Sequence, residues 1–180
     1  MVPVLETERL ILRGHRLDDF RASAAMWADP IVARYTSGQP LTEEEAWTKF
    51  LRYAGHWSLL GFGYWAVEEK SSGEYIGEIG FANYKREIDS PLKNLPEIGW
   101  MLASPSHGRG YATEAVRAAH VWSASRFGAS ETSCIISPQN LPSIRVAEKS
   151  GYREFQRTLY KGHPVIVFRR SASNAVNPTL

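Results

Sequence analysis

Apolar and polar residues alternate along some segments of the chain and recur every three or four positions along others. This pattern predicts strands interspersed with helices. Strands are expected at Leu5–Arg13, Tyr64–Glu68, Tyr75–Tyr84, Glu97–Leu102, Glu131–Ser137, Tyr152–Leu159 and Val165–Arg170. Helices are expected from Asp18 to Pro30, from Thr42 to a break at Leu59–Gly63, from a glycine loop to about Phe127, and at Asn140–Ser150. The order of these elements predicts one α/β (α+β) domain built on a mixed sheet.

Local signals mark several ends of these elements. Asp18 is expected to cap the first helix, and Thr42 with Glu45 has the form of a capping box. Gly151 is a suitable residue to stop the last helix. Hairpin turns are expected at Ser71–Gly73 and around Lys161–Gly162.

Composition narrows the classes of protein to consider. The 180 residues suffice for one domain, which we expect to span residues 1–170, with 171–180 as a loose polar tail. The 21 basic and 19 acidic residues are too evenly balanced to suggest a nucleic-acid partner. Cys134 is the only cysteine, so no internal disulfide is possible. There is no apolar run of transmembrane length and no signal-peptide pattern, so we expect a cytoplasmic protein with no membrane partner.

Several enzyme signatures are absent. The five histidines show no short metal-ligand spacing, and with one cysteine no metal site is expected. The sequence has no Gly-x-Ser-x-Gly, no Gly-x-x-x-x-Gly-Lys-Ser/Thr and no Gly-x-Gly-x-x-Gly motif. Serine hydrolases, P-loop NTPases and dinucleotide-binding folds are therefore disfavoured.

The segment Ser106–Ala115 joins the strand at Glu97–Leu102 to a helix and contains Gly108 and Gly110. Glycine allows a tight turn and a close approach of the backbone to a ligand. The first amides of a helix have no partners within it, so they form a site for a phosphate or pyrophosphate. A plain strand-to-helix turn is the alternative interpretation of this pattern.

A second motif follows the strand at Glu131–Ser137. Asn140 and Ser143 are three residues apart and share one face at the start of a helix. Asn140 could serve only as a helix cap, and Ser143 could be a solvated residue of the first turn.

Together the two motifs resemble the GNAT superfamily of acyl-CoA-dependent N-acetyltransferases. His107-x-x-Gly110-x-Ala112 is similar to the pyrophosphate loop of that family, with His107 where Gln or Arg is usual. Gly110–Ala115, Asn140–Tyr152 and the opening Thr7–Arg13 resemble the branch of ribosomal-protein-alanine N-acetyltransferases, the RimJ/RimL-like branch. The resemblance implies a mixed, mostly antiparallel sheet flanked by helices, with a V-shaped opening between the fourth and fifth strands.

The resemblance also implies how acetyl-CoA would bind. Backbone amides from Arg109 to Thr113 would hold the pyrophosphate, and the end of the Glu97 strand would pair with the pantetheine arm. Asn140 would hydrogen-bond the arm from the other side, and Ser143 would lie near the sulfur. The implied cofactor-binding residues are Trp100, Met101, Leu102, His107, Gly108, Arg109, Gly110, Tyr111, Ala112, Thr113, Asn140 and Ser143.

Acetyl transfer to an amine needs a neutral amine, a donor to the carbonyl oxygen and a proton for the leaving thiolate. We favour Glu97 as the base over Glu78, because Glu97 lies on the strand that leads to the cofactor, although either glutamate could only pair with a nearby arginine. The splayed strand at Met101 could supply the N–H donor. Ser143 is the candidate acid, by resemblance and position.

The sequence thus predicts an acetyl-CoA-dependent N-acetyltransferase that attacks directly in a ternary complex, as a monomer or homodimer. The acceptor is expected to be a primary amine, either a protein N-terminus or a small molecule. A non-catalytic acyl-CoA-binding module and a nucleotide-binding protein are the alternatives. Aromatic residues that could read the acceptor, or could equally belong to the core, are Trp27, Tyr35, Trp47, Trp57, Phe62 and Tyr84.

Overall fold

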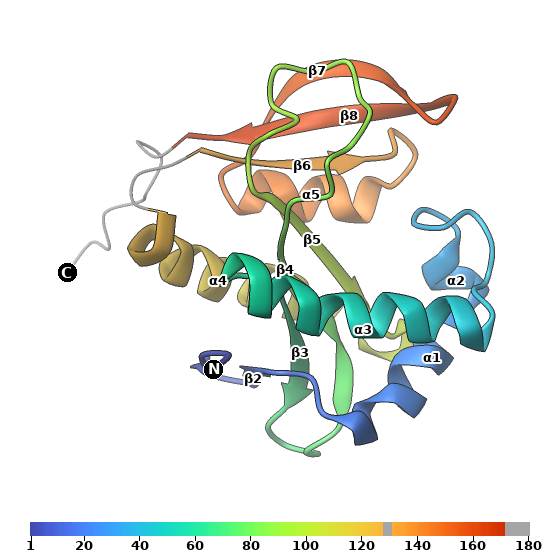
Figure 1. The fold of residues 1–180 in the computed structure, drawn as a ribbon, viewed down its shortest axis with the longest axis vertical. Coiled ribbons are helices and arrows are strands. Elements are labelled where there is room, and N and C mark those ends of the chain that lie inside the picture. The colour runs from blue at the N-terminus through green and yellow to red at the C-terminus, as the bar shows by residue number, and fades with distance from the viewer. Residues whose placement is uncertain (128–130, 172–180) are drawn as a thin grey trace.

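The computed structural model of the protein describes residues 1–127 and 131–171 (Figure 1). Its strands are β1 (Leu5–Glu6), β2 (Leu10–Arg13), β3 (Tyr64–Glu69), β4 (Tyr75–Ala82), β5 (Glu97–Leu102), β6 (Thr132–Ile136), β7 (Arg153–Tyr160) and β8 (His163–Arg170). Its helices are α1 (Phe20–Ala28), α2 (Pro30–Ala33), α3 (Glu43–Leu60), α4 (Tyr111–Phe127) and α5 (Leu141–Lys149), with short 3-10 turns η1 (Leu17–Asp19) and η2 (Ser104–Ser106).

All these strands form one sheet in the order β1-β2-β3-β4-β5-β6-β8-β7. Neighbouring strands run antiparallel except β5 and β6, which are parallel and pair only at Glu97 and Ser133. The sheet therefore opens beyond that pair. This confirms the predicted mixed, mostly antiparallel sheet and the position of its opening.

The two faces of the sheet carry different helices (Figure 1). On one face, α4 and α5 cover the main apolar core, which includes Trp65, Phe81 and Ile98. On the other face, α1 to α3 cover smaller clusters around Trp27 and Tyr53. Helices therefore lie on both sides of the opening.

Glycines let the ring of Tyr64 lie flat on the second face. A Cβ on Gly99 would stand 2.1 Å from the Tyr64 hydroxyl, and one on Gly80 would stand 2.4 Å from the Tyr64 Cα. The Tyr64 ring stacks on that of Tyr53, with 5.0 Å between centroids, and its hydroxyl accepts a hydrogen bond from Tyr84 at 3.1 Å. The buried layer on this face of β4 and β5 is thus tyrosine packed directly on glycine backbone.

Most local predictions are confirmed. Thr42 and Glu45 form the capping box, and Gly151 has φ +87° where α5 has ended. The turn at Lys161 and Gly162 has two positive φ angles, which suit a tight hairpin.

Two predictions near the N-terminus were wrong. The first strand is divided into β1 and β2, because Thr7 N–H bonds to the Leu10 carbonyl and turns the chain. Asp18 caps no helix; the neighbouring Asp19 accepts from the Arg16 amide and from Arg13, at 2.7 and 2.8 Å. Arg13 reaches Asp19 because β2 holds it there, and that contact decides between two adjacent aspartates.

The predicted tail, the absence of a membrane span and the absence of a metal site concern only part of the chain. Of the predicted tail, residues 172–180 lie outside the described residues. Within the described ranges no helix has the length and apolarity needed to cross a membrane. The same ranges contain no group of three or more His, Cys, Asp or Glu side chains arranged to hold a metal ion.

Candidate functional site

The glycine loop lies between η2 and the first turn of α4, at the end of β5. Gly108 and Gly110 have φ angles of +75° and +82°, a conformation that side chains disfavour. No atom lies within 4 Å of the place where a Cβ on Gly108 would stand, so this side of the loop is open. The first amides of the 17-residue helix α4 point out of the helix and carry the positive end of its dipole. The loop therefore offers a concave row of donors to an anion.

Thr7 and Arg9, which lie just before β2, hold this loop in place through hydrogen bonds. Thr7 Oγ1 donates to Glu114 at 2.6 Å, and the backbone N–H and Nε of Arg9 donate to the same carboxylate at 2.9 and 2.7 Å. Arg9 Nη1 also donates to the Arg109 carbonyl at 2.9 Å. Burial acts to raise the pKa of Glu114, but the bonds from Thr7 and Arg9 outweigh it and the pKa falls below its usual value.

Tyr111 contributes a second set of contacts that hold the glycine loop. Its ring lies between two guanidinium groups, 4.6 Å from that of Arg9 and 4.7 Å from that of Arg109. Its hydroxyl donates to Glu69, which also pairs with Arg109 at 3.0 Å. The glycine loop is thus held by β2, β3 and α4 together. Apart from the resemblance of the opening segment to a family pattern, nothing in the sequence pattern predicts these contacts around Tyr111 and Glu114.

The edge of β5 faces the opening with alternate residues. Ala103 N–H bonds to the Ile76 carbonyl and Pro96 C=O accepts from Ser133, so successive residues point to β4 and to β6 in turn. By this alternation the backbone groups of Trp100 and Leu102 face the opening, whereas those of Met101 face Glu78 of β4. The N–H groups that face the opening are therefore those of Trp100 and Leu102, and that of Met101 is bonded to β4.

His107 occupies the place where the family pattern has Gln or Arg. Its Nε2 lies 2.8 Å from the Leu102 carbonyl, which can only accept, so Nε2 is the donor. The ring thereby ties the glycine loop to the end of β5. This contact uses one of the carbonyls that face the opening.

Asn140 and Ser143 lie on the opposite side of the opening, where α5 follows β6. Asn140 Oδ1 accepts the Ser143 N–H at 3.2 Å, so Asn140 is the cap of α5. Both residues are half-buried. The cap uses only the amide oxygen of Asn140, which leaves its Nδ2 hydrogens and the Ser143 hydroxyl as donors.

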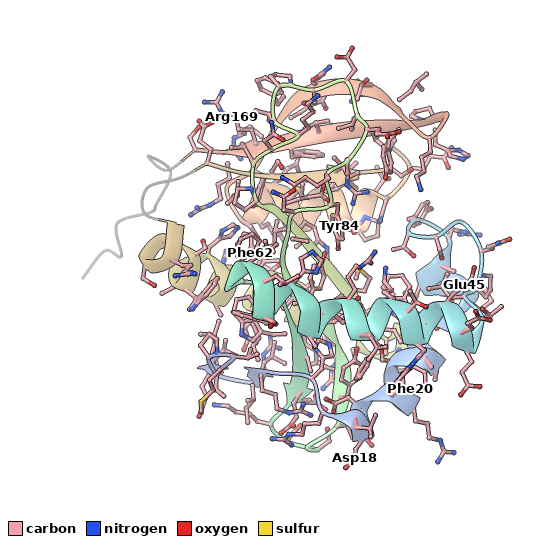
Figure 2. The ribbon with its side chains drawn as sticks, viewed as in Figure 1. Asp18, Phe20, Glu45, Phe62, Tyr84 and Arg169 are labelled. Carbon is pink, nitrogen blue, oxygen red and sulfur yellow. The ribbon has the colours of Figure 1, made fainter. Side chains whose placement is uncertain are left out.

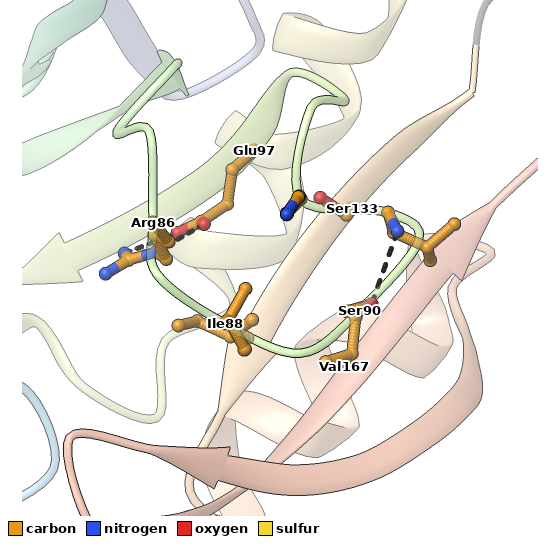
Figure 3. A pocket seen from close by; sticks show the side chains of 9 residues that line it. Arg86, Ile88, Ser90, Glu97, Ser133 and Val167 are labelled. Atoms are coloured by element: carbon orange, nitrogen blue, oxygen red, sulfur yellow. Dashed lines mark hydrogen bonds and ion pairs between the residues drawn. The ribbon is translucent and has the colours of Figure 1, made fainter.

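Glu97 stands where β5 and β6 pair, and Arg86 binds it (Figure 3). Arg86 Nε and Nη2 donate to the two carboxylate oxygens, each at 2.6 Å. The arginine comes from the 83–96 loop, whose Ile88 and Leu92 pack on Val167 of β8. A cavity of ≈ 10 Å³ beside Arg86 and Glu97 is of the size that one water needs. The arginine partner considered from the sequence is therefore present.

Glu78, the alternative base, lies deep inside the protein. Its side chain is 0% exposed. It accepts from Tyr53, from Trp27 Nε1 at 3.0 Å and from Tyr75 at 2.9 Å. Burial acts to raise its pKa, but His15, the bond from Tyr53 and the charge of Lys49 outweigh it and the pKa is lowered. A buried carboxylate saturated with donors holds α1, α3 and β4 together and cannot meet an acceptor.

The predicted site residues thus form two groups. Most of the proposed cofactor residues are contiguous along β5, the loop and the start of α4, whereas Asn140 and Ser143 follow β6 on the other side of the opening. Glu97 lies apart: at about 3.3 Å per residue it is about 10 Å along β5 from Trp100. Of the aromatic residues named from the sequence, Trp27 is core, Trp57 packs on Trp65 and Trp122, and Tyr84 lies half-buried near the opening.

A mixed sheet that parts between two parallel strands, with a glycine loop and a helix N-terminus after the first, defines the GNAT class of acyltransferase. The chain belongs to that family: the acetyltransferase (GNAT) domain matches residues 9–153. It is an enzyme of the acyltransferase class.

Individual relatives agree with this assignment. The chain is 31% identical to protein YkkB of Bacillus subtilis over 94% of this chain and 96% of that protein. It is 27% identical to the N-acetyltransferase p20 of Bacillus licheniformis, over 83% and 82% of the two chains. A GNAT-family structure from Bordetella pertussis superposes with a TM-score of 0.83 at 30% identity, covering 94% of this chain and 99% of that one.

Proposed function

We propose that the protein transfers an acetyl group from acetyl-CoA to a primary amine. The observation that carries the proposal is the alignment of an open β5 edge with the glycine loop at the α4 N-terminus. One rod-like ligand with an amide-rich arm and a pyrophosphate fits both features. Structures of this fold support the choice: RimL with coenzyme A, at 15% identity and TM-score 0.75, and AAC(6')-Ib with paromomycin and acetyl-CoA, at 16% and 0.78.

The residues present suit this cosubstrate. The open space at Gly108 would receive the pyrophosphate, with the amides of Arg109 to Thr113 as donors. The backbone groups of Trp100 and Leu102 would pair with the pantetheine arm as a neighbouring strand does. Asn140 would donate to the arm from its Nδ2 group. Met101, whose backbone faces β4, would line the site with its side chain and would not pair with the pantetheine arm.

Bound acetyl-CoA supplies a thioester carbonyl, and the protein supplies the groups around it. The N–H of Trp100 or Leu102 would donate to the carbonyl oxygen. Ser143 Oγ would return a proton to the departing sulfur. Glu97 would accept a proton from the amine through water, because about 10 Å of strand separates it from Trp100.

The amine would approach from the α1–α3 side, because acetyl-CoA would occupy the side of the glycine loop and α4. The RimJ/RimL-like resemblance supports a protein N-terminus as acceptor, and the AAC(6')-Ib likeness supports a small molecule. Cytoplasmic location and a monomer or homodimer remain predictions.

Coenzyme A release tests the proposal directly. Purified protein is mixed with acetyl-CoA and a panel of amines, and free thiol is measured with and without each amine. Amine-dependent release supports the proposal. Binding of acetyl-CoA without release by any amine supports the non-catalytic module, and preference for ATP over coenzyme A in a thermal-shift competition supports a nucleotide binder.

A further inference from the structure

Three cations gather on the α1–α3 side of the opening. Lys49 and Arg52 come from α3, and Arg86 comes from the 83–96 loop. The guanidinium carbons of Arg52 and Arg86 lie 5.2 and 4.5 Å from the centroid of the Tyr84 ring, so the ring touches both. Lys49 Nζ lies 3.9 Å from the centroid of the Trp27 ring. We call Lys49, Arg52 and Arg86 the cationic cluster.

The cluster is linked to β5 through the aromatic rings on which its cations lie. Met101 packs against both the apolar cluster of Trp27 and that of Tyr53, Tyr64 and Tyr84. The rings on which the cations lie, those of Trp27 and Tyr84, therefore belong to or pack on the two apolar clusters that Met101 contacts. Figure 2 shows Tyr84 in the middle of the molecule, between α3 and the strands above it in that view.

Carboxylates compensate only part of this charge. Both oxygens of Glu97 are occupied by Arg86, and Glu78 is enclosed beneath Tyr53 and Trp27. No ion pair among the described residues involves Lys49 or Arg52. Arg52 is also exposed, so its donors can reach a ligand.

The behaviour of Lys49 agrees with a surplus of positive charge. Its pKa falls to about 8, first because of burial and then because of Arg52 and Arg86, while Glu78 acts to raise it. An ammonium brought to Met101 would meet the same groups. The site would thus favour the neutral, nucleophilic form of the acceptor amine, whereas a polycation would be repelled.

We propose that the acceptor is a primary amine with a carboxylate close to it, and that Arg52 and Lys49 bind this carboxylate while the amine faces Met101. The carboxylate could belong to a free amino acid or to an acidic residue next to an N-terminal amine. The proposal rests on the proposed acetyltransferase function and names its class of acceptor. Arg52 is a specificity residue in this scheme, since the planar guanidinium binds carboxylates with two parallel hydrogen bonds.

Matched pairs of amines test the proposal. One pair is phenylalanine and phenylalaninamide; the other is an amidated tetrapeptide with Asp or Asn at its second position. A neighbouring carboxylate raises the pKa of an amine, so chemistry alone favours the amide of the first pair. We expect kcat/KM to be at least about ten-fold higher for the carboxylate member of one pair, and the pair that shows it identifies the source of the carboxylate.

Variants of Arg52 then test whether the cationic cluster causes the preference for amines that bear a carboxylate. Arg52→Gln should abolish the preference by raising KM for the carboxylate member while leaving kcat/KM for the neutral member unchanged. Arg21→Gln, an exposed arginine on α1 outside the cluster, is the matched control and should change neither. Equal use of both members of both pairs, or an equal loss with both in Arg52→Gln, would overturn the acceptor proposal. Absence of coenzyme A release with every amine would instead overturn the acetyltransferase function and this inference with it.

Discussion

Replacement of Glu78 by glutamine should destabilise the protein strongly. The fully buried carboxylate accepts hydrogen bonds from Tyr53, Trp27 and Tyr75, which join α1 and α3 to β4. Glutamine has nearly the same shape but offers one acceptor oxygen in place of two, and its amide hydrogens would face hydroxyl and indole donors. The variant therefore leaves buried donors unsatisfied while keeping the packing.

The size of the loss follows from the bonds that disappear. A hydrogen bond to a charged group contributes about 1.5–3 kcal/mol, and an unsatisfied buried donor costs about 1–3 kcal/mol. Because glutamine keeps one acceptor oxygen, some of these bonds survive. We therefore expect a net loss of about 3 kcal/mol in the free energy of unfolding. For a chain of this length, that corresponds to a fall in Tm of about 6–12 °C.

The loss should also depend on pH. The pKa of Glu78 is lower in the folded protein than its usual value, so its ionised form contributes stability above about pH 4.3, the usual value for glutamate. That contribution disappears as the pH falls through the folded pKa. The difference between wild type and Glu78→Gln should therefore be full at pH 7 and shrink below about pH 4.

Urea denaturation followed by tryptophan fluorescence measures this difference. Glu87→Gln, an exposed glutamate in the 83–96 loop, is the matched control and should change stability by less than about 0.5 kcal/mol. If Glu78→Gln is as mild as this control, or if its effect grows toward acid pH, the account of Glu78 as a saturated buried carboxylate is wrong.

Three further predictions concern the proposed site. Gly110→Glu should abolish acetyl-CoA binding in calorimetry without unfolding the protein, because a negative charge would enter the pyrophosphate site at a φ that side chains disfavour; an unchanged Kd would contradict the placement. Glu97→Gln should lower the rate most near neutral pH and least at high pH, where the amine is already neutral; appearance of that profile in Glu78→Gln instead would reverse the choice of base. Ser143→Ala should lower kcat about ten-fold, or about 1.4 kcal/mol of barrier, with acetyl-CoA affinity little changed; a loss that resides only in affinity would make Ser143 a binding residue.

Local chemistry made most of the fold predictable. Thr42 with Glu45, Gly151 and the Lys161–Gly162 turn each contain their own signal, so their elements could be recognised without knowledge of distant residues. Asp18 and Asp19 offer the same capping chemistry, and only the position of Arg13 on β2 distinguishes them. That position depends on the tertiary structure, so the local sequence could not reveal it.

The site was harder to predict wherever it depends on residues distant in sequence. Strand alternation grouped Glu97 with Gly99 and Met101 on one strand, and Glu78 with Gly80 and Ala82 on another. Only the register shows that the two sets share a face of the sheet, since Glu78 lies opposite Met101 and Glu97 opposite Ala82. It could not show that Trp27 and Tyr53 enclose Glu78, because those donors come from separate helices. Arg86 likewise reaches Glu97 only through the path of the 83–96 loop.

The bonds from Arg9 to Glu114 have a consequence for how the protein acquires its activity. They join positions 105 residues apart, so Arg9 is synthesised well before the helix that it will contact and must wait for it. The loop that we propose for pyrophosphate would then become competent late in folding, after β2 has docked on β3. Contacts of such long range slow folding. Acetyl-CoA would favour the docked state, so removal of the first nine residues should weaken its binding more than it weakens the core.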